Sequence, residues 1–112
     1  MNRIYFDDLE VVKQEKVWFA TCQEENGQVR REPRCYIHLN KKGRIWHPKN
    51  EFWALMRGWD ALLEFKPGQR VEAELSFSIH KSSRKNTQRV LVNKILLIPD
   101  IKREVVYPWD NV

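Results

Sequence analysis

The sequence predicts one mainly β domain that carries a single helix, and three features of the chain support this fold class. Apolar and polar residues alternate from Arg70 to His80, which is the two-residue period of a half-buried strand. The run from Val90 to Ile98 is apolar at nearly every step, which is typical of a strand covered on both faces. Between Asn50 and Phe65, in contrast, apolar residues recur at three- and four-residue steps, the period of a helix.

Length and composition fit a single unit. The chain has 112 residues, of which 42% are hydrophobic, enough for one core and not for two. No stretch approaches the ~18 apolar residues of a membrane span, and the N-terminus lacks a signal-peptide core, so we expect a cytoplasmic protein. Two cysteines, Cys22 and Cys35, are too few for a disulfide framework and are expected to be free thiols.

The first third of the chain predicts two strands and a loop. Within residues 1–10, Ile4, Tyr5 and Phe6 predict a short lead-in strand that Asp7-Asp8 interrupts. A long strand, Val11–Gln23, is expected to bend near Lys13–Lys16. A loop then spans Glu24–Pro33, with Asn26-Gly27 as its turn signal.

Residues 34–48 predict a hairpin that turns at Asn40–Gly43. A three-residue loop would place His38 opposite Trp46, whereas a two-residue loop would pair Ile37 with Trp46. In the first register, the inward residues are Cys35, Ile37, Leu39, Ile45 and His47. The outward residues are Tyr36, His38, Arg44 and Trp46.

The helix is expected at about residues 50–65, with its ends marked by ordinary signals. Asn50 can cap the first turn through its side-chain oxygen, and Pro67-Gly68 cannot continue a helix. Trp53 and Trp59 lie at helical spacing, so we expect them in the core rather than in a ligand site.

The order of elements is therefore three strands, a helix and two strands. This is the order of the oligonucleotide/oligosaccharide-binding (OB) fold, a five-stranded Greek-key barrel with a helix between strands 3 and 4. We expect residues 1–99 to form the barrel and residues 100–112 to form a docked C-terminal tail. Such barrels bind ligands with strands 2 and 3 and with the loops between strands 1 and 2 and strands 4 and 5.

Positive charge is concentrated in the predicted binding elements. Residues 34–49 and residues 75–99 each contain five cations and no acid, although the whole chain has a net charge of only +5. These stretches cover strands 2 and 3 and a polar, basic loop at 81–89. The segregation predicts a surface that faces a polyanion.

The combination of rings and cations predicts single-stranded nucleic-acid binding, because bases stack on aromatic faces for about 1–3 kcal/mol each while cations contact phosphates. The stacking candidates are Trp46, Tyr36 and His38. The phosphate-binding candidates are Arg44, Lys41, Lys42, Lys81, Arg84, Lys85 and Arg89. The alternative role for Trp46 and Tyr36 is to cover the end of the barrel or to pack on the C-terminal tail.

The sequence contains no motif that predicts a catalytic site or a metal site. Cys35 and His38 lie three apart in a strand and therefore point to opposite faces, so they cannot share a metal. There is no glycine-rich phosphate loop and no nucleophile elbow. We expect no enzyme activity, no metal and no cofactor.

The last part of the chain resembles a known family. The block LLEFKPGQRVEAELSFSIH (62–80), followed by a basic loop and RVLVNKILLI (89–98), is similar to bacterial and phage OB-fold proteins of single-stranded-DNA-binding type. Members share a Phe-Lys-x-Gly-(Asp/Gln)-x-Val turn and an Asn-containing fifth strand. The resemblance implies an OB fold and a preference for single-stranded DNA over RNA.

A competing interpretation is a protein-interaction or oligomerisation module with the same fold. The tail carries Tyr107 and Trp109, which could mediate self-association. Salt dependence separates the two functions, because only phosphate contacts release counterions on binding.

Overall fold

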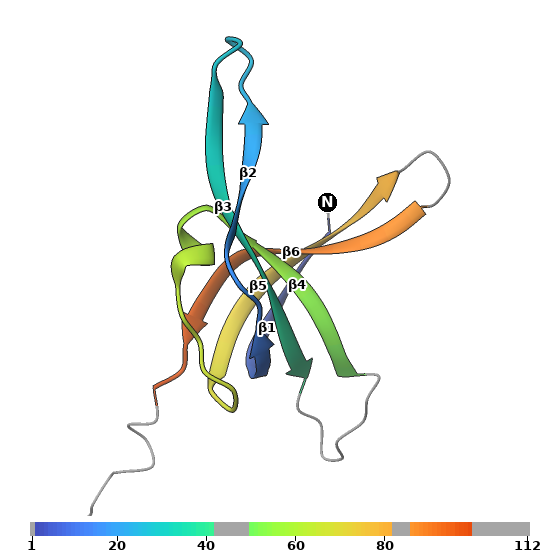
Figure 1. Cartoon of the computed structure of the whole chain (residues 1–112). Coiled ribbons are helices and arrows are strands. Elements are labelled where there is room, and N and C mark those ends of the chain that lie inside the picture. The colour runs from blue at the N-terminus through green and yellow to red at the C-terminus, as the bar shows by residue number, and fades with distance from the viewer. Residues whose placement is uncertain (1, 42–49, 82–85, 100–112) are drawn as a thin grey trace, which may run out of the picture.

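The computed structural model describes residues 2–41, 50–81 and 86–99, with the backbone alone at residues 80, 81 and 86–88 (Figure 1). Six strands and one 3-10 helix, η2, make up this part of the chain. In chain order they are β1 (Asn2–Gln14), β2 (Trp18–Gln23), β3 (Val29–Lys41), β4 (Glu51–Arg57), η2 (Gly58–Leu62), β5 (Arg70–Lys81) and β6 (Asn86–Leu97). The predicted tail, 100–112, lies outside the described residues.

The strand pairings close into a ring. The sheet order is β1-β5-β6-β4-β3-β2, and β1 also pairs with β3. Five strands therefore follow one another around the ring, with β4 and β6 parallel and every other pair antiparallel. The remaining strand, β2, pairs with the first half of β3, and the two extend away from the other strands as a hairpin (Figure 1).

The first strand is longer than expected and bends twice. Its register with β5 shifts between Phe6 and Leu9, and its register with β3 shifts between Val11 and Lys13. Such bulges increase the twist of a strand and let it take part in two pairings at different angles. The predicted strand 11–23 is wrong as a single element, because β1 ends at Gln14 and β2 begins at Trp18.

The core lies on the inner side of the ring. Cys35, Ile37 and Leu39 of β3 are fully buried, as the alternation predicts. Burying side chains of this size stabilises the fold by about 1.5–3 kcal/mol each. The core residues are Leu9, Val11, Cys35, Ile37, Leu39, Ala54, Met56, Ala61, Phe65, Val71, Ala73, Leu75, Val92 and Ile95.

The inward positions predicted for β5 hold from Val71 as far as Phe77, which packs against the core, and the prediction fails at Ile79. Leu75 is buried, but Ser76 is buried as well and Ile79 is exposed. The pairing with β6 shifts register between Glu74 and Leu75, because Asn93 is an extra residue in β6 at this point. The Ser76 hydroxyl accepts a hydrogen bond from the side-chain amide of Asn93.

The predicted helix at 50–65 is wrong. Residues 51–57 form β4, and only Gly58–Leu62 is helical, as a short 3-10 turn. Gly58 has φ +67°, a left-handed conformation that no α-helix contains. In the strand, the backbone is hydrogen-bonded by β3 on one edge and β6 on the other, which outweighs the local helical period.

The predicted pairing within residues 34–48 is also wrong. The partner of His38 in the next strand is Trp53, and the other edge of β3 at this position is occupied by Lys13. Neither the His38–Trp46 pair nor the slipped Ile37–Trp46 pair can form when both edges are taken. Residues 42–49, which include Arg44, Ile45, Trp46 and His47, lie outside the described residues.

Two predicted loops are shorter than expected. The turn at Asn26-Gly27 is confirmed, with Gly27 at φ +83° and its N–H 3.0 Å from the Glu24 carbonyl oxygen. However, β3 begins at Val29, so the loop does not extend to Pro33. In the same way, β5 and β6 take up both ends of the predicted loop 81–89.

Candidate functional site

The outer side of β3 carries aromatic side chains that meet rings from two neighbouring strands. Tyr36 and His38 alternate with the buried core residues and therefore point outward. Trp18 of β2 lies opposite Arg34, and Trp53 of β4 lies opposite His38, so both share this side. We call Trp18, Tyr36, His38 and Trp53 the aromatic face.

The four rings form two contacting pairs. The centroids of Trp18 and Tyr36 are 5.2 Å apart with the planes tilted by 31°. His38 stacks on Trp53 at 4.5 Å and 11°, and its Nε2 lies 3.3 Å from Glu51 Oε2. Trp18, Tyr36 and Trp53 remain 38, 40 and 43% exposed, so each keeps ring surface for a planar ligand.

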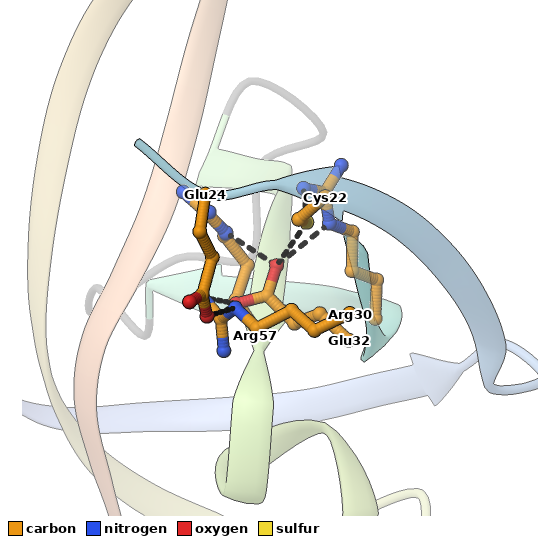
Figure 2. Close-up of polar contacts among 6 residues, drawn as sticks. Cys22, Glu24, Arg30, Glu32 and Arg57 are labelled. Carbon is orange, nitrogen blue, oxygen red and sulfur yellow. Dashed lines mark hydrogen bonds and ion pairs between the residues drawn. The ribbon is translucent and has the colours of Figure 1, made fainter. Parts of the chain in front are cut away.

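An arginine cluster continues the same side of β3 toward the hairpin (Figure 2). At its centre is Glu32, which is only 8% exposed. Its carboxylate lies 3.1 Å from Arg34 Nε and 3.3 Å from Arg57 Nε, and a more distant contact of 3.9 Å joins it to Arg30 Nη2. We call Arg30, Glu32, Arg34 and Arg57 the arginine cluster.

The arginines keep Glu32 ionised. Burial alone would raise the pKa of its carboxyl, but the hydrogen bond from Arg34 and the charge of Arg57 outweigh burial and lower it. Arg30 is also paired with Glu24 at 3.1 Å, so three guanidinium groups face two carboxylates and the surplus is one positive charge. Figure 2 also shows Cys22 beside the cluster, with its Sγ 3.5 Å from Arg34 Nη2.

Aromatic residues also lie on the other side of the hairpin. Phe19 follows Trp18 in β2 and therefore points the opposite way, with the Arg31 guanidinium 5.2 Å from its ring centre. Trp59, in η2, is 85% exposed. These residues border a hollow of about 350 Å³ that is lined by Phe19, Arg30, Arg31, Glu32, Pro33, Gly58, Trp59 and Leu62.

The structure brings together only part of the predicted site. Tyr36 and His38 lie on the aromatic face. Lys41 is exposed at the end of β3 with its Nζ 5.7 Å from the Phe6 ring centre, and Arg89 is half-buried in β6. The remaining predicted site residues lie outside the described side chains: Trp46, Lys42, Arg44, Lys81, Arg84 and Lys85.

The sequence prediction missed Trp53 as part of the site. It was expected in the core together with Trp59, and both expectations are wrong, since the two rings are exposed. Treating residues 51–57 as a strand would have placed Trp53 on the face opposite Ala54 and Met56. Gly58 was the available signal, because a glycine inside a helix is unfavourable.

The described residues offer no metal site. Within them, no group of three His, Cys, Asp or Glu side chains is placed to hold a metal ion. Both cysteines are free, and burial raises the pKa of the Cys35 thiol, so this thiol is poorly suited to act as a nucleophile. Nor does any helix in the described ranges have the length and apolar character of a membrane span.

No protein-family model matches the sequence, and no curated protein matches it. A comparison of structures does find a relative in fold. The chain is similar to PriB from Ralstonia solanacearum. The two share 18% sequence identity and a TM-score of 0.52, over 88% of this chain and 99% of PriB. The similarity supports the mainly β, OB-like fold class. The helix predicted at about residues 50–65 is absent from the described residues, where β4 and a short 3-10 turn lie instead.

Proposed function

We propose that the chain is an OB-fold barrel that binds single-stranded nucleic acid on its aromatic face. The ring of pairings, with β3 and β4 as its second and third strands, supports the barrel assignment. In OB folds these two strands form the ligand-binding face. The observation that carries the proposal is that four aromatic rings, from β2, β3 and β4, gather on the outer side of β3, next to a cluster of arginines.

The chemistry of the face suits unpaired bases. A base is a flat ring that stacks on Trp or Tyr for about 1–3 kcal/mol, whatever its identity. In a duplex these faces are already stacked on each other, so an exposed aromatic face favours single strands. The preference for DNA over RNA rests on the resemblance of residues 62–98 to single-stranded-DNA-binding proteins, and competition between oligo(dT) and oligo(U) tests it.

A second candidate function is protein interaction on the opposite side of the hairpin. The observation that favours it is Trp59, whose ring is 85% exposed beside the exposed Phe19. Exposed aromatic side chains that border a hollow are typical of docking surfaces. This function predicts that binding of the protein partner does not require an oligonucleotide and that its affinity changes little with salt concentration.

A fluorescence anisotropy titration with labelled oligo(dT) tests the main proposal. If about five cations contact phosphates, log affinity plotted against log salt falls with a slope of roughly −3.5 for a single strand. Unlabelled duplex of the same length should compete poorly. A flat salt response at measurable affinity would refute phosphate recognition and favour the protein-interaction function.

A further inference from the structure

A polar hollow lies beside the arginine cluster and is not part of the aromatic face. It has a volume of about 560 Å³. Five strands of the ring contribute side chains to it. Its lining residues are Arg3, Glu32, Arg57, Glu74, Leu91, Val92, Asn93 and Lys94.

The hollow opens on the same side of the sheet as the aromatic face. Arg57 lies opposite Arg34, and Leu55, two residues before Arg57, lies opposite Tyr36. Residues two apart in a strand are separated by about 6.6–6.8 Å and point the same way. The backbone position of Arg57 is therefore one such step along β4 from the residue opposite Tyr36.

The side chains that line the hollow include three cations and two carboxylates. Glu74 is paired with Arg3 at 3.5 Å. Glu32 contacts Arg57, but it is also shared with Arg34 and Arg30. Lys94 is exposed, and within the described part of the chain no carboxylate lies within ion-pair distance of its ammonium group.

Glu32 holds Arg57 in a way that leaves most of its donors available. The contact uses Nε of Arg57, at 3.3 Å from Glu32 Oε2. A guanidinium has five N–H donors in a fixed plane, so the two terminal nitrogens can still bind an anion in a bidentate manner. Because Glu32 is buried and fixed, Arg57 is oriented before any ligand arrives.

We infer that this hollow binds a backbone phosphate of the same strand whose bases stack on the aromatic face. Arg57 and Lys94 contact the phosphate oxygens, and Glu32 is a positioning residue that orients Arg57. This inference rests on the proposed function and extends it, since it assigns phosphate recognition to residues of β4 and β6.

Two substitutions test the assignment in the oligo(dT) titration. Arg57→Gln and Lys94→Gln each remove one cation from the hollow and should each make the salt slope shallower by about 0.7. If a variant and the wild type bind equally at 1 M salt, the variant should bind roughly fivefold more weakly at 0.1 M salt. Arg57→Gln also removes a partner of the buried Glu32 and could disturb the fold. Lys94→Gln does not touch Glu32, so it tests phosphate binding separately.

Arg31→Gln is the matched control. It removes the same charge, but its guanidinium lies over Phe19 on the other side of the hairpin, so the salt slope should stay at the wild-type value. If Arg57→Gln and Lys94→Gln both keep the wild-type slope while Trp53→Ala weakens binding, the phosphate assignment is wrong and the proposed function stands. If the wild-type chain shows no salt-dependent binding of oligo(dT), both are wrong.

Discussion

The two sides of the β2–β3 hairpin carry the same kinds of side chain but hold them differently. Trp18 and Phe19 are neighbours in sequence and point to opposite sides. Trp18 rests against Tyr36 at 5.2 Å, whereas Phe19 is contacted by the Arg31 guanidinium and borders the same hollow as the exposed ring of Trp59. Glu32 lines the hollows on both sides.

The difference concerns pre-organisation. Rings that already stack on each other lose little freedom when a base is added, so most of the stacking energy becomes affinity. Trp59 stands on a five-residue 3-10 turn and would have to be ordered by its partner. We therefore expect the aromatic face to bind small planar groups and the other side to contribute only where a large partner covers it.

The largest expected effect is on binding, through Trp53. Trp53→Ala removes the ring that stacks on His38 and should weaken oligo(dT) binding by about 1–3 kcal/mol. Trp53→Phe retains a ring and should recover most of this loss. Both are measured by anisotropy at a temperature where each variant is fully folded.

Trp59→Ala is the control on the opposite side of the hairpin. Its ring contacts little of the folded chain, so both stability and oligonucleotide affinity should change by less than about 0.5 kcal/mol. Equal losses for Trp53→Ala and Trp59→Ala would show that the two sides do not differ as the structure indicates.

The second prediction concerns Glu32 and its dependence on pH. Glu32→Gln leaves Arg34 and Arg57 without their carboxylate and should lower the free energy of unfolding at pH 7 by about 2 kcal/mol, as judged by urea denaturation. The folded pKa of Glu32 lies below its ordinary value of 4.5, so its contribution is complete above that value. It is lost as the pH falls through the folded pKa, and the gap between the two proteins should narrow there.

Glu24→Gln provides the comparison for this charge change. Glu24 pairs with Arg30 at 3.1 Å, but both side chains are largely exposed. Exposed pairs contribute about 0.2–1 kcal/mol, so this variant should be the milder of the two. Similar losses from the two substitutions would contradict a special role for the buried carboxylate.

The smallest effect is expected at Gly58, which begins the turn that carries Trp59. At φ +67° a side chain is strained, although a Cβ would meet no atom within 4 Å. Gly58→Ala should therefore cost about 1 kcal/mol of stability from backbone strain alone. Gly58→Asn should cost less, because Asn tolerates the left-handed conformation.

Oligonucleotide affinity is the second measurement on these Gly58 variants. It should stay within about twofold of wild type, since the turn is separate from the aromatic face. A marked loss of affinity would mean that the turn supports the bound strand.

Local patterns predicted the inner side of β3 and the turn at Gly27, because both depend on neighbours in the sequence. Cys35, Ile37 and Leu39 alternate with polar residues, and the structure buries all three. The helix prediction failed for a physical reason. The apolar residues between 52 and 63 satisfy a helical period, but the local sequence does not reveal that β3 and β6 offer two open strand edges.

For the candidate site too, the sequence predicted the residues that depend on local alternation and missed those that depend on strand pairing. Tyr36 and His38 were assigned correctly to the outer side of β3, since only alternation decides it. Trp53 was missed because its position follows from the strand that replaced the helix. The arginine cluster also depends on long-range pairing: Arg57 reaches Glu32 only after β3 and β4 align, and no spacing in the sequence indicates that contact.

The ring of strands has a consequence for how the chain is made. Ile4 of β1 pairs with Leu75 of β5, 71 positions later. At roughly 5–20 residues per second, ribosomal synthesis of the intervening chain takes several seconds. During that interval the inward residues of β1, including Leu9 and Val11, have no completed core, and the edge of β1 that will pair with β5 is open to other chains. The N-terminal strand therefore gains its second neighbouring strand only late in synthesis.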